Sequence, residues 1–336
     1  MKYRTLKILF TLLLLILAFV VRGQDPQFSQ FYSNPLYLAP SFAGLTDDSR
    51  ISLNYRNQWP EIPGGFTTYS CAFDHFFDVF QSGLGVFVMK DVAGSGQLSL
   101  TNIGVSYSFD FKISDYWHVR PGLHFAYSQR GIDVEKLVWH DQISPVGNAP
   151  VSAEVVPLKR VGNIDVSSSV LAYSDKFWVG FSADHLLTPN QSLYHINLNE
   201  PMEGYVPIKY SFFGGTKIIR QGKLYRPMDT SLQLAFLFKT QQKYTQLDLG
   251  MYFYKNPVVV GLWYRGIPFK KPHFNQDAFT GLLGLKFNDV SIGYSYDFTI
   301  SRLITSTGGA HEVSLSYDFQ IKIKERRPKM VPCPDF

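Results

Sequence analysis

The sequence predicts an all-β fold, a transmembrane antiparallel β-barrel of about 14 strands whose lumen is occluded, and three observations support this prediction. The first is side-chain alternation with a period of 2, which the stretch VSIGYSYDF at 290–298 shows best. Successive side chains of a strand point to opposite faces. One face here is small and polar, with Ser291, Gly293, Ser295 and Asp297. The other face is apolar, and we expect it to meet lipid: Val290, Ile292, Tyr294, Tyr296 and Phe298.

The second observation is the length of the alternating segments. Most are longer than the five or six residues usual in soluble sheets, and about 9–11 residues suffice for a tilted strand to cross a bilayer. The predicted strands are 50–57, 66–76, 82–90, 97–111, 115–129, 160–174, 176–184, 207–219, 228–238, 243–254, 256–266, 276–287, 288–298 and 310–320. Breaks of phase near Asn102 and at Phe212-Phe213 are interpreted as β-bulges.

The third observation is that connection lengths alternate along the chain. Short connections follow every second strand, while the long ones, at 130–159, 185–206, 267–275 and 299–309, fall on the opposite side. Outer-membrane barrels have short periplasmic turns and long outer loops, whereas a soluble sandwich has no reason to sort its loops. The connection 220–227 is longer than this rule predicts.

Residues 1–23 read as a cleaved signal peptide, because the basic Lys2, Arg4 and Lys7 precede the apolar run 8–21. That run is too short to span a bilayer. Four of the 32 basic residues lie in this segment, so 28 basic and 27 acidic residues follow it. This near balance gives no support to nucleic-acid binding.

Residues 24–49 have neither a strand nor a helix period, and Pro26, Pro35 and Pro40 argue against both elements. The segment is nevertheless rich in Phe, Tyr and Leu. We therefore expect it to pack in the barrel mouth or to bind a periplasmic partner, with the barrel spanning 50–320.

The last predicted strand, HEVSLSYDF at 311–319, ends on an aromatic residue, as strands that address the barrel-assembly machinery do. We expect its apolar face to meet lipid as well: Val313, Leu315, Tyr317 and Phe319. The basic, proline-containing residues 321–336 then form a periplasmic tail. Both termini are expected on the periplasmic side.

The sequence shows no recognisable catalytic or cofactor-binding site. Asp74-His75 and His140-Asp141 are adjacent pairs, and adjacent strand residues point to opposite faces. His118, Arg120 and His124 share one lumen face, where hydrogen bonds across the barrel to carboxylates such as Asp248 or Asp297 explain them better than a metal or substrate site.

The aromatic residues near strand ends fit an interfacial girdle better than sugar-stacking platforms: Trp59, Trp117, Trp178, Trp263 and Tyr264. Cys71 and Cys333 are expected to be unpaired thiols, although an oxidising periplasm would allow them to pair.

Several stretches resemble one family. They are QDPQFSQFYSNPLYLAPSFAG (24–44), YRNQWP (55–60), GLWYRG (261–266), IGYSYDFTISRLITSTGGAHEVSLSYDF (292–319) and the final PCPDF. Together they resemble the PorP/SprF proteins of the type IX secretion system, end to end along the chain after the signal segment.

The resemblance implies a non-enzymatic outer-membrane barrel that takes part in protein secretion or gliding motility. The expected partners are lipid, a secreted surface protein or the C-terminal domain of an adhesin, and periplasmic lipoproteins of the secretion system. No cofactor, metal or catalytic residue is implied. The motif residues expected to serve architecture first and partner contact second are Arg56, Trp59, Arg265, His311, Cys333 and Phe336. The alternative function is a diffusion channel or transporter for a small solute.

Overall fold

The computed structural model describes residues 25–46, 49–144, 147–148, 152, 159–193, 204–221, 230–267, 275–300 and 307–321. Its barrel strands are β1 (Ser49–Gln58), β2 (Phe66–Phe77), β3 (Ser82–Ala93), β4 (Leu98–Phe109), β5 (Phe111–Lys112), β6 (His118–Gly131), β9 (Arg160–Tyr173), β10 (Phe177–Asp184), β11 (Lys209–Gln221), β12 (Thr230–Gln241), β13 (Tyr244–Lys255), β14 (Val258–Ile267), β15 (Asn275–Phe287), β16 (Val290–Thr299) and β17 (Ala310–Phe319). The short elements are η1 (Phe31–Ser33), α2 (Pro35–Leu38), η2 (Pro40–Phe42), η3 (Asp78–Phe80), η4 (Val134–Lys136), η5 (His140–Gln142), β7 (Ile143–Ser144) and β8 (Gly147–Asn148).

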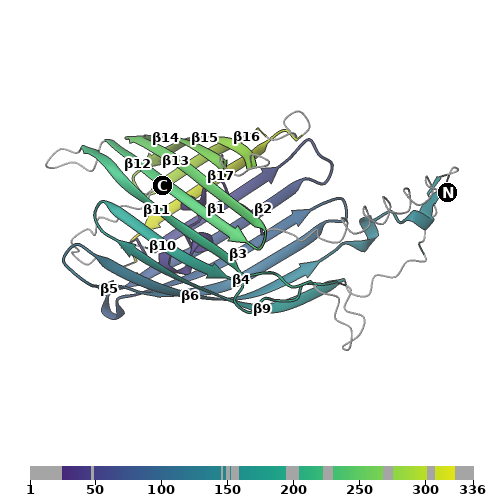
Figure 1. Cartoon of the computed structure of the whole chain (residues 1–336), viewed down its shortest axis with the longest axis horizontal. Coiled ribbons are helices and arrows are strands. Elements are labelled where there is room, and N and C mark those ends of the chain that lie inside the picture. Colours follow the sequence, from purple (N-terminus) through teal and green to yellow (C-terminus); the bar gives the residue numbers. More distant parts are fainter. Residues whose placement is uncertain are drawn as a thin grey trace, which may run out of the picture.

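The strands close into an antiparallel barrel (Figure 1). β1 pairs with β2 on one side and with the last strand, β17, on the other, so the sheet has no free edge at this seam. β5 continues β4 along β6, and the 15 strands of the sheet therefore form a barrel of 14. The predicted antiparallel barrel of about 14 strands is confirmed.

The wall has two chemically different faces, as the alternation predicts. In β16, Ile292, Tyr294 and Phe298 are 47%, 44% and 57% exposed, whereas Ser295 and Asp297 are buried inside. In β17, Val313, Leu315 and Tyr317 point outward in the same way. A closed barrel with an apolar outer face satisfies every backbone group without water, which is the requirement for crossing a bilayer with strands.

The two ends of the barrel differ. The end called the turn end here has the connections 78–81, 113–117, 174–176, 222–229, 256–257 and 288–289. The opposite end, called the loop end, has the short connections 94–97 and 242–243 and the longer connections 59–65, 132–159, 185–208, 268–274 and 300–309. β1 begins at the turn end and β17 finishes there.

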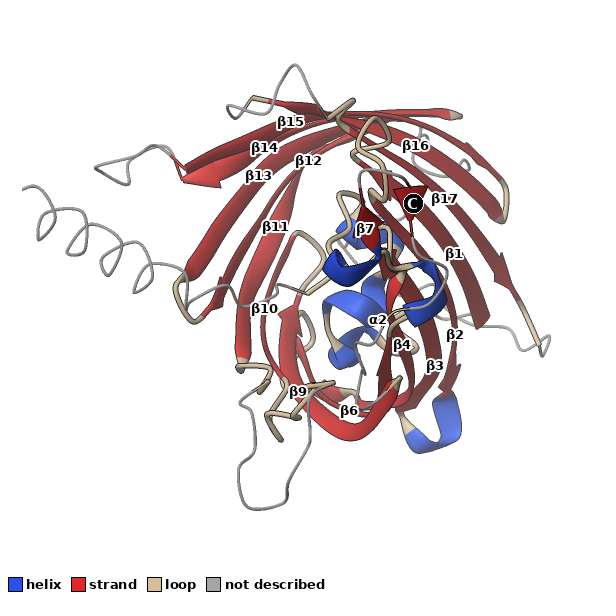
Figure 2. Ribbon diagram, turned by 90° about the vertical axis from the view of Figure 1, so that its right-hand side faces the viewer, coloured by secondary structure: helices blue, strands red, loops and turns tan. Residues whose placement is uncertain are grey.

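Residues 25–46, called the lumen segment here, lie inside the barrel. Figure 2 shows their short helices enclosed by the ring of strands. The wall makes room for the segment with inward glycines. A Cβ atom at Gly83 would lie 1.9 Å from the carbonyl oxygen of Ala43, and one at Gly122 would lie 2.3 Å from the amide nitrogen of Ser41. Only glycine permits this close backbone approach.

Two sequence-based interpretations are wrong. Trp178 and Trp263 are not girdle residues but point inward and are buried, because each lies between two outward residues of its strand. Neither phase break is a bulge: the pairings of β4 run through Asn102 without a shift, and β10 and β11 pair without a shift from 177 to 184. Phe213 instead points inward, fully buried, and packs against Phe42 of the lumen segment.

None of the helices in the described part of the chain has the length and apolar character needed to cross a membrane.

The outward face of β16 offers a direct test of membrane insertion. Ile292→Arg should cost about 2–4 kcal/mol of folding free energy if this position lies mid-bilayer, while Phe298→Arg, on the same outward face near the end of the strand, should cost about 0–1 kcal/mol. Denaturant unfolding in lipid vesicles measures both. Equal effects of the two substitutions would contradict the assignment of this face to lipid.

Candidate functional site

The most highly connected polar site of the described residues is an ion-pair network in the loop-end half of the lumen. Arg56 of β1 donates to Asp297 of β16 at 2.9 Å and to Glu312 of β17 at 3.1 Å. Arg265 of β14 donates to the same Asp297 oxygen at 3.1 Å. Alternation places all four side chains on the inner face, so four strands meet in one network.

The lumen segment enters this network through its backbone. The amide N–H groups of Ser29 and Gln30 donate to the two carboxylate oxygens of Glu312, at 2.7 and 3.0 Å. The Ser29 hydroxyl donates to Asp297 at 2.6 Å and accepts hydrogen bonds from both arginines. The network therefore recognises a short peptide by its amide groups and one hydroxyl.

The Gln30 side chain completes the attachment. Its amide nitrogen donates to Ser295 Oγ and to the carbonyl of Glu312, each at 3.0 Å, and its oxygen accepts from Ser314 at 2.6 Å. Gln30 is fully buried with both ends of its amide satisfied. Buried polar groups with complete partners fix one arrangement, because any shift leaves a donor or acceptor unpaired.

On the turn-end side of the network, aromatic side chains pack the lumen segment against the wall. Phe31 packs edge-on against Trp263, with ring centroids 4.9 Å apart, and Tyr32 packs against Tyr252 at 4.5 Å. Such edge-to-face pairs add stability beyond the area they bury. Trp263 in turn lies against the backbone at Gly250, where a Cβ atom would be 2.1 Å from its ring. The lumen thus contains a hydrophobic core of its own.

At the turn end the segment is held by its carbonyl groups. Arg120 donates to the carbonyls of Ala43 and Gly44, at 2.6 and 3.2 Å, and Ser108 donates to that of Ala43 at 2.7 Å. The Gly44 amide donates to Asp74 at 2.9 Å. Gly44 adopts a left-handed φ of 59°, which suits glycine at this exit turn.

The three basic lumen residues do form hydrogen bonds, but their partners are Asp110, Ser106 and the lumen segment rather than Asp248 or Asp297 across the barrel. His118 Nδ1 lies 3.0 Å from a carboxylate oxygen of Asp110, and His124 Nδ1 lies 2.8 Å from Ser106 Oγ. Arg120 is buried against the lumen segment. Among the residues that the structure describes, no group of three His, Cys, Asp or Glu side chains could hold a metal ion.

At the loop end, a second charged cluster fastens the start of the segment. Asp25 accepts from Lys209 at 2.8 Å and lies 2.9 Å from His185 Nε2, whose other ring nitrogen contacts Asp165. Burial alone would lower the pKa of His185, but the charge of Asp25 and the bond to Asp165 raise that pKa to about 10. Burial likewise acts to raise the pKa of Asp25, yet Lys209 and His185 hold it well below its usual value. His185 is therefore charged at neutral pH.

The predicted motif residues separate into two groups. Arg56 and Arg265 come together in the lumen network, whereas Trp59 and His311 do not reach it. Trp59 has a left-handed φ of 60°, and its amide donates to the carbonyl of Gly309 at 2.8 Å, which joins β1 to the turn before β17. His311 points outward, with its Nδ1 2.8 Å from Tyr294 Oη.

The GGAHE motif supplies the residues that motif reasoning overlooked. Gly308 and Gly309 take left-handed φ values of 67° and 68°, and Glu312 turns inward to the lumen segment. Alternation in the sequence already predicts Asp297 as a carboxylate on the polar face. Ser29 and Gln30 carried no periodic signal. Cys71 is a free thiol on the outer face, while Cys333 and Phe336 lie outside the described residues.

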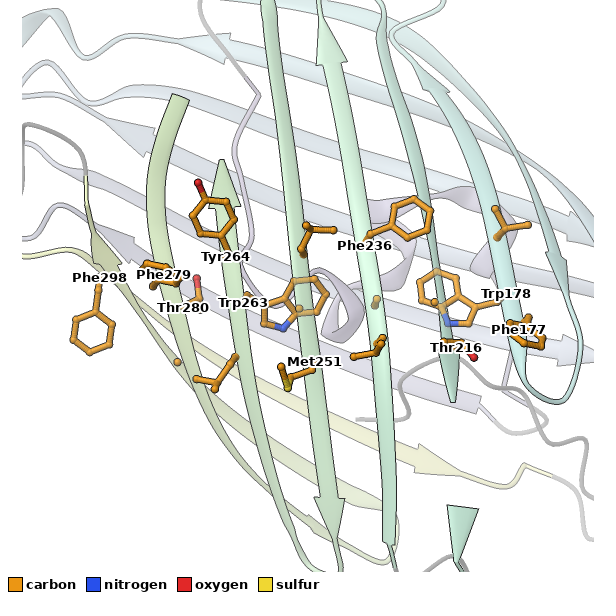
Figure 3. A pocket seen from close by; sticks show the side chains of 18 residues that line it. Phe177, Trp178, Thr216, Phe236, Met251, Trp263, Tyr264, Phe279, Thr280 and Phe298 are labelled. Carbon is orange, nitrogen blue, oxygen red and sulfur yellow. The ribbon is translucent and has the colours of Figure 1, made fainter. Parts of the chain in front are cut away.

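An apolar hollow of about 1010 Å³, called the outer furrow here, crosses the outside of the wall from β10 to β16. Figure 3 shows its side chains in rows that run from strand to strand. Exposed residues such as Phe177, Met251 and Phe279 line it, and small residues such as Gly215 and Gly250 also border it.

Comparison with known proteins identifies the chain. The family model described as type IX secretion system membrane protein PorP/SprF matches residues 20–317. The chain belongs to the PorP/SprF family. This agrees with the resemblance carried by the motifs above, and the PorP/SprF barrel described here is a secretion-system membrane protein rather than a member of an enzyme family.

Other comparisons add little. No curated protein matches the chain. Solved barrels resemble it distantly: the outer membrane protein Omp33 of Acinetobacter baumannii is 8% identical, with a TM-score of 0.44 over 83% of this chain and 100% of that one. A Pseudomonas aeruginosa FadL homologue is 14% identical, with a TM-score of 0.45 over 84% and 93%. Likeness at this level carries no inference about function.

The lumen network predicts a specific cost when its central cation is removed. Arg56→Met should destabilise the PorP/SprF barrel by about 3–5 kcal/mol, because Glu312 is left buried without its ion partner. Arg160→Met, at an exposed position of β9, should change stability by less than about 0.5 kcal/mol. Guanidinium unfolding followed by tryptophan fluorescence compares the two variants. A small effect at Arg56 would show that the network does not hold the structure together.

Proposed function

We propose that this protein is a non-enzymatic outer-membrane component of the type IX secretion system, which helps to export or anchor a surface protein and contacts periplasmic secretion machinery. Membership of the family supports the general role. In this proposal the loop end faces the cell exterior and the turn end faces the periplasm, because outer-membrane barrels carry their long connections outside.

The observation that carries the proposal is the difference between the two ends of the barrel. The connections 132–159 and 185–208 extend from the loop end and include short elements of their own, such as η4, η5 and the β7–β8 pair. Loops held on a rigid scaffold are suited to gripping a partner. The described turns at the other end are short, and β17 ends there. The proposal assigns residues 321–336, which follow β17 in the sequence, to contact with a periplasmic lipoprotein.

The structure gives the alternative, a solute channel, less support. The lumen segment is tied to the wall at both ends and in the middle, through Asp25, Gln30 and Ala43. We therefore propose that the lumen is occluded. A purified protein that conducts ions in a planar bilayer would favour the channel instead.

Partner capture with two matched variants tests the proposal. The first variant replaces residues 186–206 at the loop end with a short Gly-Ser hairpin, and the second lacks residues 322–336. With an affinity tag in the connection 132–159 and mild detergent, the first should lose a surface protein and keep periplasmic lipoproteins, and the second should do the reverse.

Heat-modifiable migration of both variants in gel electrophoresis serves as the control for a folded barrel. Recovery of both classes of partner by both folded variants would contradict the proposed division between the two ends. Recovery of the barrel alone, even from the unmodified protein, would contradict the secretion role itself.

A further inference from the structure

A cavity of about 430 Å³ lies at the loop end of the lumen, between the start of the lumen segment and the inner wall. Asp25, Gln27 and Tyr37 form one side, and residues of β1 and of β11 to β15 form the other. Its volume falls in the range of small-molecule sites. It borders the Arg56–Glu312 network through Gln58 and Asp277, whereas the space inside that network is filled by Ser29 and Gln30.

Among the described residues, two lysines at this cavity, Lys239 and Lys243, have no carboxylate within hydrogen-bonding distance. Lys239 is mostly buried, and its Nζ atom has one carboxylate nearby in the described structure, Asp248, at 4.0 Å. That separation is too long for a hydrogen bond. Asp248 is in addition engaged by Arg265 at 3.4 Å and by Gln246 at 2.8 Å. The positive charge of Lys239 is therefore only partly balanced by a neighbouring carboxylate.

Two further donors face the same space. Lys243, in the turn between β12 and β13, forms no ion pair with any described residue. The Gln27 side-chain nitrogen is buried and has no hydrogen-bond partner among the described residues. Lys243 is exposed, and its ammonium group can only donate. The Gln27 donor is buried, and a buried donor without an acceptor is costly.

The carboxylates that line the cavity do not serve as acceptors for these donors, because they are paired elsewhere or too far away. Asp25 is occupied by Lys209 and His185, and Lys209 is further engaged by Asp184. Asp277 is half exposed, and its nearest cation is Arg265, at 3.9 Å. The donors that remain without partners at this site can therefore bind a negatively charged hydrogen-bond acceptor.

We propose that this cavity binds a carboxylate, which Lys239, Lys243 and Gln27 receive together. Charge-assisted hydrogen bonds from two ammonium groups and an amide suit its two oxygens. The flat rings of Trp59, Tyr37 and Tyr244 form apolar walls for the body that carries it. A carboxylate of this kind is present at the C-terminal end of a polypeptide and on an acidic sugar.

Calorimetric titration of the full-length protein in detergent tests the site. The probes are triglycine, triglycine amide and galacturonic acid, at neutral pH. At least one of the two carboxylates, triglycine or galacturonic acid, should bind. If triglycine binds, triglycine amide should bind about tenfold more weakly, because the amide cannot accept two charge-assisted hydrogen bonds.

Lys239→Met should weaken binding by about tenfold or more, and Lys243→Met, at an exposed turn where folding is not at stake, should weaken it in the same direction. Lys255→Met, at the turn end of β13, is the matched control and should bind as the unmodified protein does. Binding of triglycine alone would assign the site to a chain end, and binding of galacturonic acid alone would assign it to a sugar acid. No binding of either carboxylate, or equal binding by the Lys243 variant and the control, would overturn the proposal.

Discussion

The ion pair between Arg56 and Glu312 is the interaction on which the rest of the structure depends. The two residues are direct partners in the register of β1 and β17, so the pair lies across the seam where the barrel closes. The same carboxylate receives the backbone of the lumen segment at Ser29 and Gln30. One buried group thus joins the first strand, the last strand and the segment that precedes them. Since two buried charges are costly to desolvate, they favour this single arrangement rather than adding much net stability.

The barrel wall has an apolar environment on each side, lipid outside and the aromatic side chains of the lumen inside. One alternating sequence pattern supplies the side chains for both faces. Outward side chains form the surface suited to lipid, whereas inward aromatic residues such as Trp178, Trp263 and Phe213 pack on the lumen segment. The segment itself runs through the lumen from Asp25 at the loop end to Gly44 near the turn end. Its first described residue and the end of β17 therefore lie at opposite ends of the barrel, while both chain termini fall outside the described residues.

Much of the fold could be predicted because strand periodicity is a local property. The number of strands, their bounds within a few residues and the inward position of Asp297 all follow from alternation. The contacts of the lumen segment could not be predicted, since Gln30 and Ser295 are far apart in sequence and neither has a distinctive neighbourhood. The inward tryptophans show that position along a strand determines direction more than residue type does. Trp178 lies between Phe177 and Val179, and because both of these side chains point outward, Trp178 points inward.

The placement of the lumen segment is the central claim, and disulfide cross-linking in the membrane tests it most directly. Gln30 and Ser295, whose side chains are 3.0 Å apart, would be replaced by cysteines in a chain with Cys71→Ser and Cys333→Ser. A disulfide should form in the folded barrel, and none should form when Gln30→Cys is combined with Ser169→Cys, a wall position that contacts Ser41 instead. A folded barrel in which the cysteines at 30 and 295 stay reduced under oxidation, and both react with a soluble maleimide, would contradict it.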